Sequence, residues 1–149
     1  MVHATPGFVP GPRDELTMRT LSTFFQIIEL LLRAGATTVA EAAFQDRLWR
    51  PGLQPLQHLA RIRIVHCTVA ADVTLERRVR RMEDDPSRRA HDVSRPDDAV
   101  AEAARHDAFN RVSIDAPCVD VDTTDGYDPE LETIVAFARG DSDLARFGP

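Results

Sequence analysis

Lysine is absent from this chain, because all 18 basic residues are arginine. The absence excludes a Schiff-base lysine, a pyridoxal-phosphate anchor and the lysine of a phosphate-binding glycine loop. A codon bias accounts for an arginine excess of this kind, so each arginine is assigned a role only where its position supports one.

Cysteine and long apolar runs are also scarce. Cys67 and Cys118 lack CxxC spacing, which predicts buried free thiols in a reducing compartment rather than a disulfide or a zinc site. The longest apolar stretch, Phe24 to Leu32, is interrupted by polar residues and is too short to span a bilayer. Residues Met1 to Pro12 have no basic segment followed by an apolar one, so no secretory signal is predicted and a cytoplasmic location is expected.

Positive charge and aromatic residues are both limited. The net charge is −6 and aromatics make up 6% of the chain, which argues against nucleic-acid and membrane partners. With 149 residues, 43% of them hydrophobic, the chain is long enough for one domain with a sizeable core. A single domain over residues 1–149 is therefore expected, in which a locally basic segment remains able to bind phosphate groups.

The hydrophobic pattern alternates between helical spacing and short apolar runs typical of strands. In chain order it predicts a Pro- and Gly-rich loop at 1–13, a helix from Asp14 or Thr17 to a cap at Gly35, a strand at Thr37–Ala42, a helix at about Leu53–Arg61, a strand at Arg63–Val69, a helix capped by Asp72, a polar loop at 84–96, a helix at Asp97–Asn110, a strand at Cys118–Asp122 and a helix from Pro129 to about Arg139. This alternation predicts an α/β fold with a parallel sheet and helical crossovers.

Three stretches carry a resemblance to a known family. They are Leu31–Gly35 leading to Val39–Phe44, Val65–Val69 leading to Arg77–Arg81, and Val121–Thr124. In these stretches the chain resembles bacterial P-loop small-molecule kinases of the chloramphenicol-phosphotransferase and adenylate-kinase-like type, also described as AAA-type ATP-binding proteins. The similarity extends over most of the chain, from Leu16 to Phe137.

The resemblance implies a three-layer, P-loop NTPase-like parallel sheet with a helical lid formed around loop 84–96. It also implies ATP and Mg²⁺ as cofactors and a small hydroxylated acceptor as the second substrate, with no metal ligands assigned to the protein itself. Residues matching the family's catalytic positions are Glu41, Arg81 and Arg88, and those matching its nucleotide-binding positions are Arg77, Arg89, Asp122, Thr123 and Thr124.

Each of these assignments has a plainer alternative. Glu41 follows a predicted strand, where open α/β sheets bind ligands, but it equally suits the start of a solvated loop. Guanidinium groups bind phosphate oxygens bidentately, yet Arg77 to Arg81 also fit a solvated helix face with Glu76 and Glu83 as charge partners. Residues Asp122 to Thr124 fit a nucleotide-contacting loop or a simple turn.

The phosphate loop itself is missing from the sequence. It requires two glycines five positions apart followed by Lys and Ser or Thr, and Gly7 and Gly11 have the wrong spacing. By resemblance, the strand that leads into this loop lies between the strands at Thr37–Ala42 and Arg63–Val69, so the sheet is expected to lack its first strands. An N-terminally truncated chain is expected, with Met1 an internal methionine of a longer reading frame.

Two functional hypotheses follow. In the first, the chain is an ATP-dependent phosphotransferase fragment that is inactive as written, because no residue replaces the loop lysine. In the second, it is a non-catalytic α/β binding or oligomerisation module, such as a homo-oligomer, whose strand edges pair with another chain.

Overall fold

The structure is a computed structural model that describes residues 15–84 and 109–141. The loop predicted at 1–13 and loop 84–96, apart from Asp84, lie outside these ranges. The helix predicted at 97–110 lies outside them up to residue 108, and residues 109 and 110 are not helical. Within the described ranges the fold is mixed α/β, with four α-helices, one 3-10 helix and one two-stranded parallel sheet.

Helix α1 spans Glu15–Arg33 and confirms the first predicted helix. It ends two residues before Gly35, whose φ of 76° is disfavoured for residues with a Cβ atom. The N–H groups of Gly35 and Ala36 donate to the carbonyls of Leu32 and Leu31, which satisfies two of the last carbonyl groups of the helix.

An aromatic cluster joins α1 to helix α2, which spans Asp46–Leu53. Trp49 of α2 lies edge-on to Phe24, Phe25 and Phe44, with ring centroids 4.8–5.5 Å apart. The sequence predicts this helix later, at about Leu53–Arg61, because prolines usually end helices. That placement is wrong: α2 begins before Pro51 and continues through it to Leu53. The chain then continues as a 3-10 helix, η2, at Gln54–His58.

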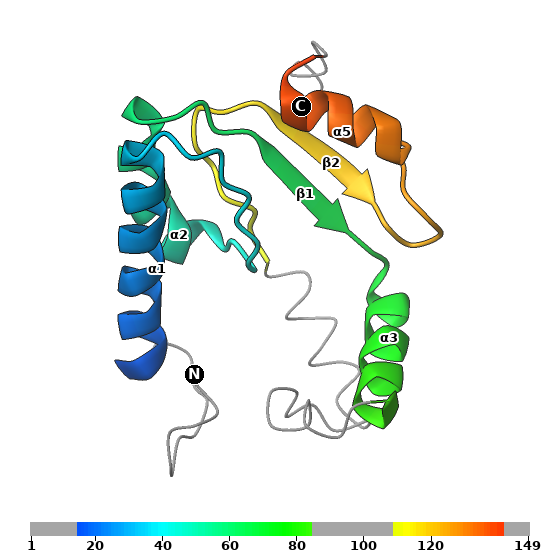
Figure 1. The fold of residues 1–149 in the computed structure, drawn as a ribbon. Helices are drawn as coiled ribbons and strands as arrows, with labels where there is room; N and C mark the ends of the chain where they lie inside the picture. Colours follow the sequence, from blue (N-terminus) through cyan, green and yellow to red (C-terminus); the bar gives the residue numbers. More distant parts are fainter. Residues whose placement is uncertain (1–14, 85–108, 142–149) are drawn as a thin grey trace.

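The sheet consists of β1, Ile64–Thr68, and β2, Cys118–Asp122, paired in parallel. Both strands were predicted within one residue of these bounds. Figure 1 shows α5 (Leu131–Arg139) lying along the two strands, while α1 and α2 lie beyond their amino-terminal ends. Helix α3 (Ala71–Asp84) leaves from the carboxyl end of β1.

The core of the sheet half lies between the strands and α5. Val121 of β2 and Phe137 of α5 are each 1% exposed. Gly140 closes α5 with a φ of 85°, and its N–H donates to the carbonyls of Ala136 and Phe137. The predicted final helix is therefore confirmed, together with its glycine cap.

The strand predicted at Thr37–Ala42 does not form. Residues 36–44 run as a loop from α1 to α2 (Figure 1), and Val39 is 96% exposed. An extended apolar segment becomes a strand only when a neighbouring strand accepts its hydrogen bonds, and no described residue offers such a partner at this position.

One edge of β1 is likewise unpaired within the described residues. Alternate residues of a parallel strand bond to opposite sides, and Ile64 and Thr68 bond toward β2. The backbone groups of Val65 and Cys67 therefore point to the other side, where no described residue pairs with them. Both side chains are exposed.

This exposure corrects the prediction of two buried thiols. Cys67 is exposed and Cys118 is half-buried. Both cysteines are free, as predicted. None of the helices in the described ranges combines the length and apolar character needed to cross a membrane.

Candidate functional site

Three predicted site residues meet where the two strands end. Thr123, which follows β2, donates its N–H and its hydroxyl to the carbonyl of Thr68 on β1, both at 2.8 Å. Arg77 of α3 reaches the same loop and donates from Nη2 to the carbonyls of Thr123 at 2.6 Å and Thr124 at 3.1 Å. The carboxyl ends of β1 and β2 and the first half of α3 thus form one connected unit, which we call the strand-end site.

Asp122 also belongs to the strand-end site, where Thr124 makes two further hydrogen bonds. The Asp122 carboxylate accepts the Thr124 N–H at 2.7 Å, and the Thr124 hydroxyl accepts the Ala70 N–H at 3.1 Å. Hydrogen bonds from Thr124 lower the pKa of Asp122, which is exposed to solvent. The loop is therefore hydrogen-bonded both by its own side chains and by Arg77.

The remaining predicted residues are not part of this unit. Arg81 lies one turn further along α3, is exposed, and donates from Nε to the Arg77 carbonyl at 3.2 Å. Glu41 is exposed on the loop between α1 and α2 and forms no ion pair or hydrogen bond with the described residues. Arg88 and Arg89 lie outside the described residues, so their assignment stays a prediction.

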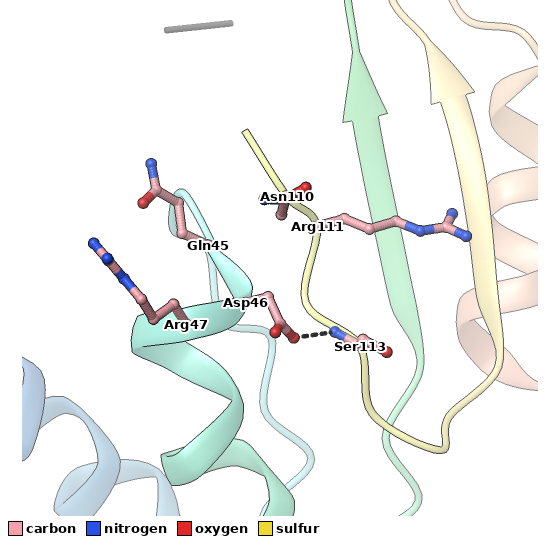
Figure 2. Close-up of a pocket in the computed structure, with 6 residues that line it drawn as sticks. All are labelled: Gln45, Asp46, Arg47, Asn110, Arg111 and Ser113. Atoms are coloured by element: carbon pink, nitrogen blue, oxygen red, sulfur yellow. Dashed lines mark hydrogen bonds between the residues drawn. The ribbon is translucent and has the colours of Figure 1, made fainter. Parts of the chain in front are cut away.

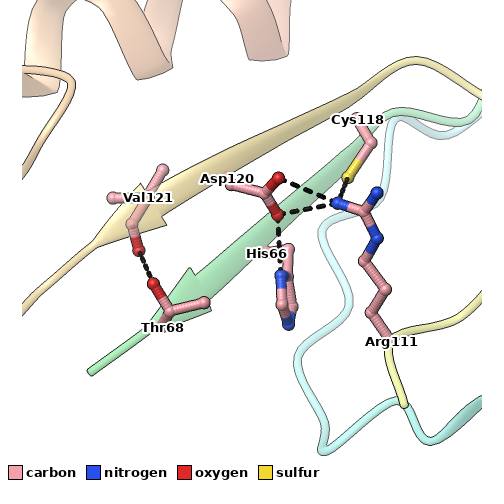
Figure 3. Close-up of polar contacts among 6 residues, drawn as sticks. All are labelled: His66, Thr68, Arg111, Cys118, Asp120 and Val121. Carbon is pink, nitrogen blue, oxygen red and sulfur yellow. Dashed lines mark hydrogen bonds and ion pairs between the residues drawn. The ribbon is translucent and has the colours of Figure 1, made fainter. Parts of the chain in front are cut away.

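A second polar cluster, which is not among the site residues predicted from the sequence, lies on the sheet face opposite Val121. His66 of β1 and Asp120 of β2 are register partners, with His66 Nδ1 2.8 Å from Asp120 Oδ1 (Figure 3). Arg111 donates from Nη1 to both carboxylate oxygens at 2.8 Å and lies 4.0 Å from the Cys118 sulfur. A paired His and Asp at equal positions in two parallel strands is the sequence signal for this cluster.

The cluster changes the acid–base properties of its members. Burial acts to raise the pKa of Asp120, but hydrogen bonds and charges from His66 and Arg111 outweigh it and lower that pKa. The Asp120 hydrogen bond and charge raise the pKa of Arg111, which therefore stays a cation. Burial raises the pKa of the Cys118 thiol, so this sulfur is a weak nucleophile at neutral pH.

Acid is expected to weaken the fold through Asp120. Because its pKa is lower in the folded state, its contribution to the free energy of unfolding is complete above the unfolded value of about 3.9 and is lost as the pH falls through the folded value. We expect Asp120→Asn to reduce stability at pH 7 and at pH 5, and the difference from the parent chain to shrink below about pH 4. Urea denaturation of both proteins across this range measures it, and a difference that stays constant down to pH 3 would contradict the assignment.

A pocket lies between α2 and the segment after residue 108. It measures about 550 Å³ and is lined by Gln45, Asp46, Arg47, Asn110, Arg111 and Ser113 (Figure 2). Asp46 ties its two walls together, since its Oδ1 accepts the Ser113 N–H at 2.7 Å and its own N–H donates to the Asn110 carbonyl at 2.9 Å. Figure 2 shows the Arg111 side chain leaving this pocket toward the sheet.

No group of three or more His, Cys, Asp or Glu side chains able to hold a metal ion occurs within residues 15–84 and 109–141. Comparison with known proteins gives no relative: no protein-family model, no curated protein and no solved structure matches the chain.

Proposed function

We propose that the strand-end site is one wall of the nucleotide site of an ATP-dependent small-molecule phosphotransferase. The observation that supports it most strongly is the pair of hydrogen bonds from Arg77 to the carbonyls of Thr123 and Thr124. These residues were assigned to the nucleotide by resemblance, and they lie together at the carboxyl ends of parallel strands, where open α/β sheets bind ligands.

In this proposal Arg77 is a positioning residue. Its Nη2 group is engaged by two carbonyls, so its main action is to fix the loop that contacts the nucleotide. Arg81, Arg88 and Arg89 would supply positive charge to the phosphates, and Glu41 would face the acceptor or Mg²⁺. ATP would supply the phosphoryl group.

The proposed site is incomplete in a specific way. Phosphoryl transfer depends on a cradle of backbone N–H groups and a cation on the phosphates, and a phosphate loop provides both. The chain contains no lysine, so a loop of that kind has to come from another polypeptide segment. The edge of β1 at Val65 and Cys67, which no residue of ranges 15–84 and 109–141 pairs, is where a strand carrying such a loop would pair.

This chain alone is therefore expected to show no ATP turnover. We also expect ATP with Mg²⁺ at millimolar concentration to leave the melting temperature unchanged, because a ligand raises it only when it binds the folded state. Thermal melts with and without nucleotide, together with a phosphate-release assay, measure both effects. Turnover that disappears in Arg77→Gln but persists in Arg80→Gln would refute the inactivity and support the location of the site.

A non-catalytic binding or oligomerisation module is the second candidate. It is favoured by the β1 edge, which has no partner strand in the part of the chain that the structure describes, and by the exposure of Val39, since both suit the addition of a strand from another chain. Light scattering after size-exclusion chromatography distinguishes the two. A uniform dimer that never responds to nucleotide, even with a phosphate loop supplied, would favour the module.

A further inference from the structure

The segment Phe109–Asp115, which we call the strap, connects α2 and η2 on one side to the β1–β2 sheet on the other. On one side Arg111 pairs with Gln45 in an antiparallel bridge, and Asn110 accepts the Asp46 N–H. The Gln57 side chain adds a hydrogen bond to the Asp115 carbonyl at 2.6 Å. The strap is thereby fastened to α2 and η2.

On its other side the strap is fastened to the sheet through side chains. Arg111 binds the Asp120 carboxylate of β2 with two contacts of 2.8 Å. Beside it, the Phe109 ring stacks on His66 of β1, with an interplanar angle of 5° and centroids 6.0 Å apart. The groups that face the Asp120 carboxylate are thus His66 from β1, Arg111 from the strap and Cys118 from β2 itself.

The Arg111–Asp120 ion pair on the sheet is connected to the pocket beside α2 through the main chain of Arg111. The main chain of Arg111 lines the pocket between Asn110 and Ser113, while its guanidinium lies on the sheet (Figures 2 and 3). The Ser113 N–H is held by Asp46, so any shift of the strap also changes that contact. The Arg111 guanidinium, bound on the sheet, is therefore linked through its own main chain to the Asn110 and Ser113 wall of the pocket.

We propose that Arg111 is a latch: by binding Asp120, it holds the strap across the sheet and positions the Asn110 and Ser113 wall of the pocket. The latch is separate from the strand-end site, and its role does not depend on the proposed phosphotransferase function. Its charge-assisted hydrogen bonds are of the stronger kind, although the partial exposure of both partners reduces their effect.

Hydrogen exchange of the full chain tests this role residue by residue. In Asp120→Asn, which keeps the side-chain shape but loses the charge, we expect the Asp46 and Ser113 amides to exchange about fivefold faster. The ladder amides of Val119 and Val121 should change less than about twofold. Asp115→Asn is the matched control, because it removes an exposed strap carboxylate that makes no described side-chain contact, and it should change neither pair.

A second variant separates the latch from a general loss of stability. Arg111→Lys keeps one charged donor but loses the guanidinium fork, so its Asp46 and Ser113 amides should exchange at rates between those of the parent and Asp120→Asn. The proposal is overturned if the ladder amides accelerate as much as the strap contacts in these variants. It is also overturned if the Asp46 and Ser113 amides do not respond, or if Asp115→Asn has the same effect as Asp120→Asn.

Discussion

Replacing Phe137 by alanine is expected to lower the free energy of unfolding by about 3–5 kcal/mol, the usual range for removing a buried phenylalanine ring. Phe137 is 1% exposed and belongs to α5, the helix that lies along β1 and β2. The sheet has two strands in the described residues, so little other apolar contact is available to refill the cavity. Chemical denaturation followed by circular dichroism measures the loss.

The matched control is Leu131→Ala on the same helix. Leu131 is 53% exposed, so its loss should cost below about 1 kcal/mol. Equal effects for the two substitutions would show that α5 is not held on the sheet through Phe137.

Replacing Gly52 by alanine is expected to destabilise the chain by about 1–3 kcal/mol, the usual range when an added methyl group meets packed side chains. Alanine is normally the better helix residue by roughly 0.5–1 kcal/mol, and Gly52 lies inside α2. A Cβ atom at this position would, however, overlap the ring of Phe25. That ring is confined by Trp49, with centroids 5.5 Å apart, so it has little freedom to move away.

The rescue variant combines Gly52→Ala with Phe25→Leu, which removes the ring that the new methyl group meets. The loss of stability in the double variant should be smaller than the sum of the two separate losses, as expected for residues in contact. If Gly52→Ala alone raises the melting temperature, helix propensity rather than packing decides this position.

The parts of the fold that the sequence predicted correctly are those encoded locally. Helix α1 has a long apolar periodicity and a glycine to end it, and β1 and β2 are short apolar runs bounded by polar residues. In each case the neighbouring residues contain the signal, so the bounds agree within one or two residues. Gly140 marked the end of α5 for the same reason.

The failures come from contacts between distant residues. The segment Thr37–Ala42 has a strand composition, but composition cannot provide the neighbouring strand that it needs. Helix α2 includes Pro51, and its Trp49 packs into an aromatic cluster, an interaction that no local rule contains.

The contacts of the candidate site also separate into those that local sequence patterns predict and those that depend on distant residues. Arg77 and Asp122 to Thr124 come together because the parallel pairing of β1 with β2 was predictable. The Arg111–Asp120 ion pair was not, since it joins the irregular strap to the middle of a strand. Arg81 and Glu41 lie apart from the strand-end site, and their roles stay predictions.

The central claim is that the strand-end site binds nucleotide once a lysine-bearing phosphate loop is supplied. The most direct measurement is calorimetric titration of ATP with Mg²⁺ into the chain mixed with a polypeptide that carries an apolar strand, a glycine-rich loop ending in Lys-Ser, and a helix. We expect ATP binding that requires both components, weakens at least tenfold in Arg77→Gln, and is retained in Arg80→Gln, since a lost charge-assisted contact costs about 1.5–3 kcal/mol. A complex that forms through β1 but binds no ATP, or binds it equally well in Arg77→Gln, would contradict the account.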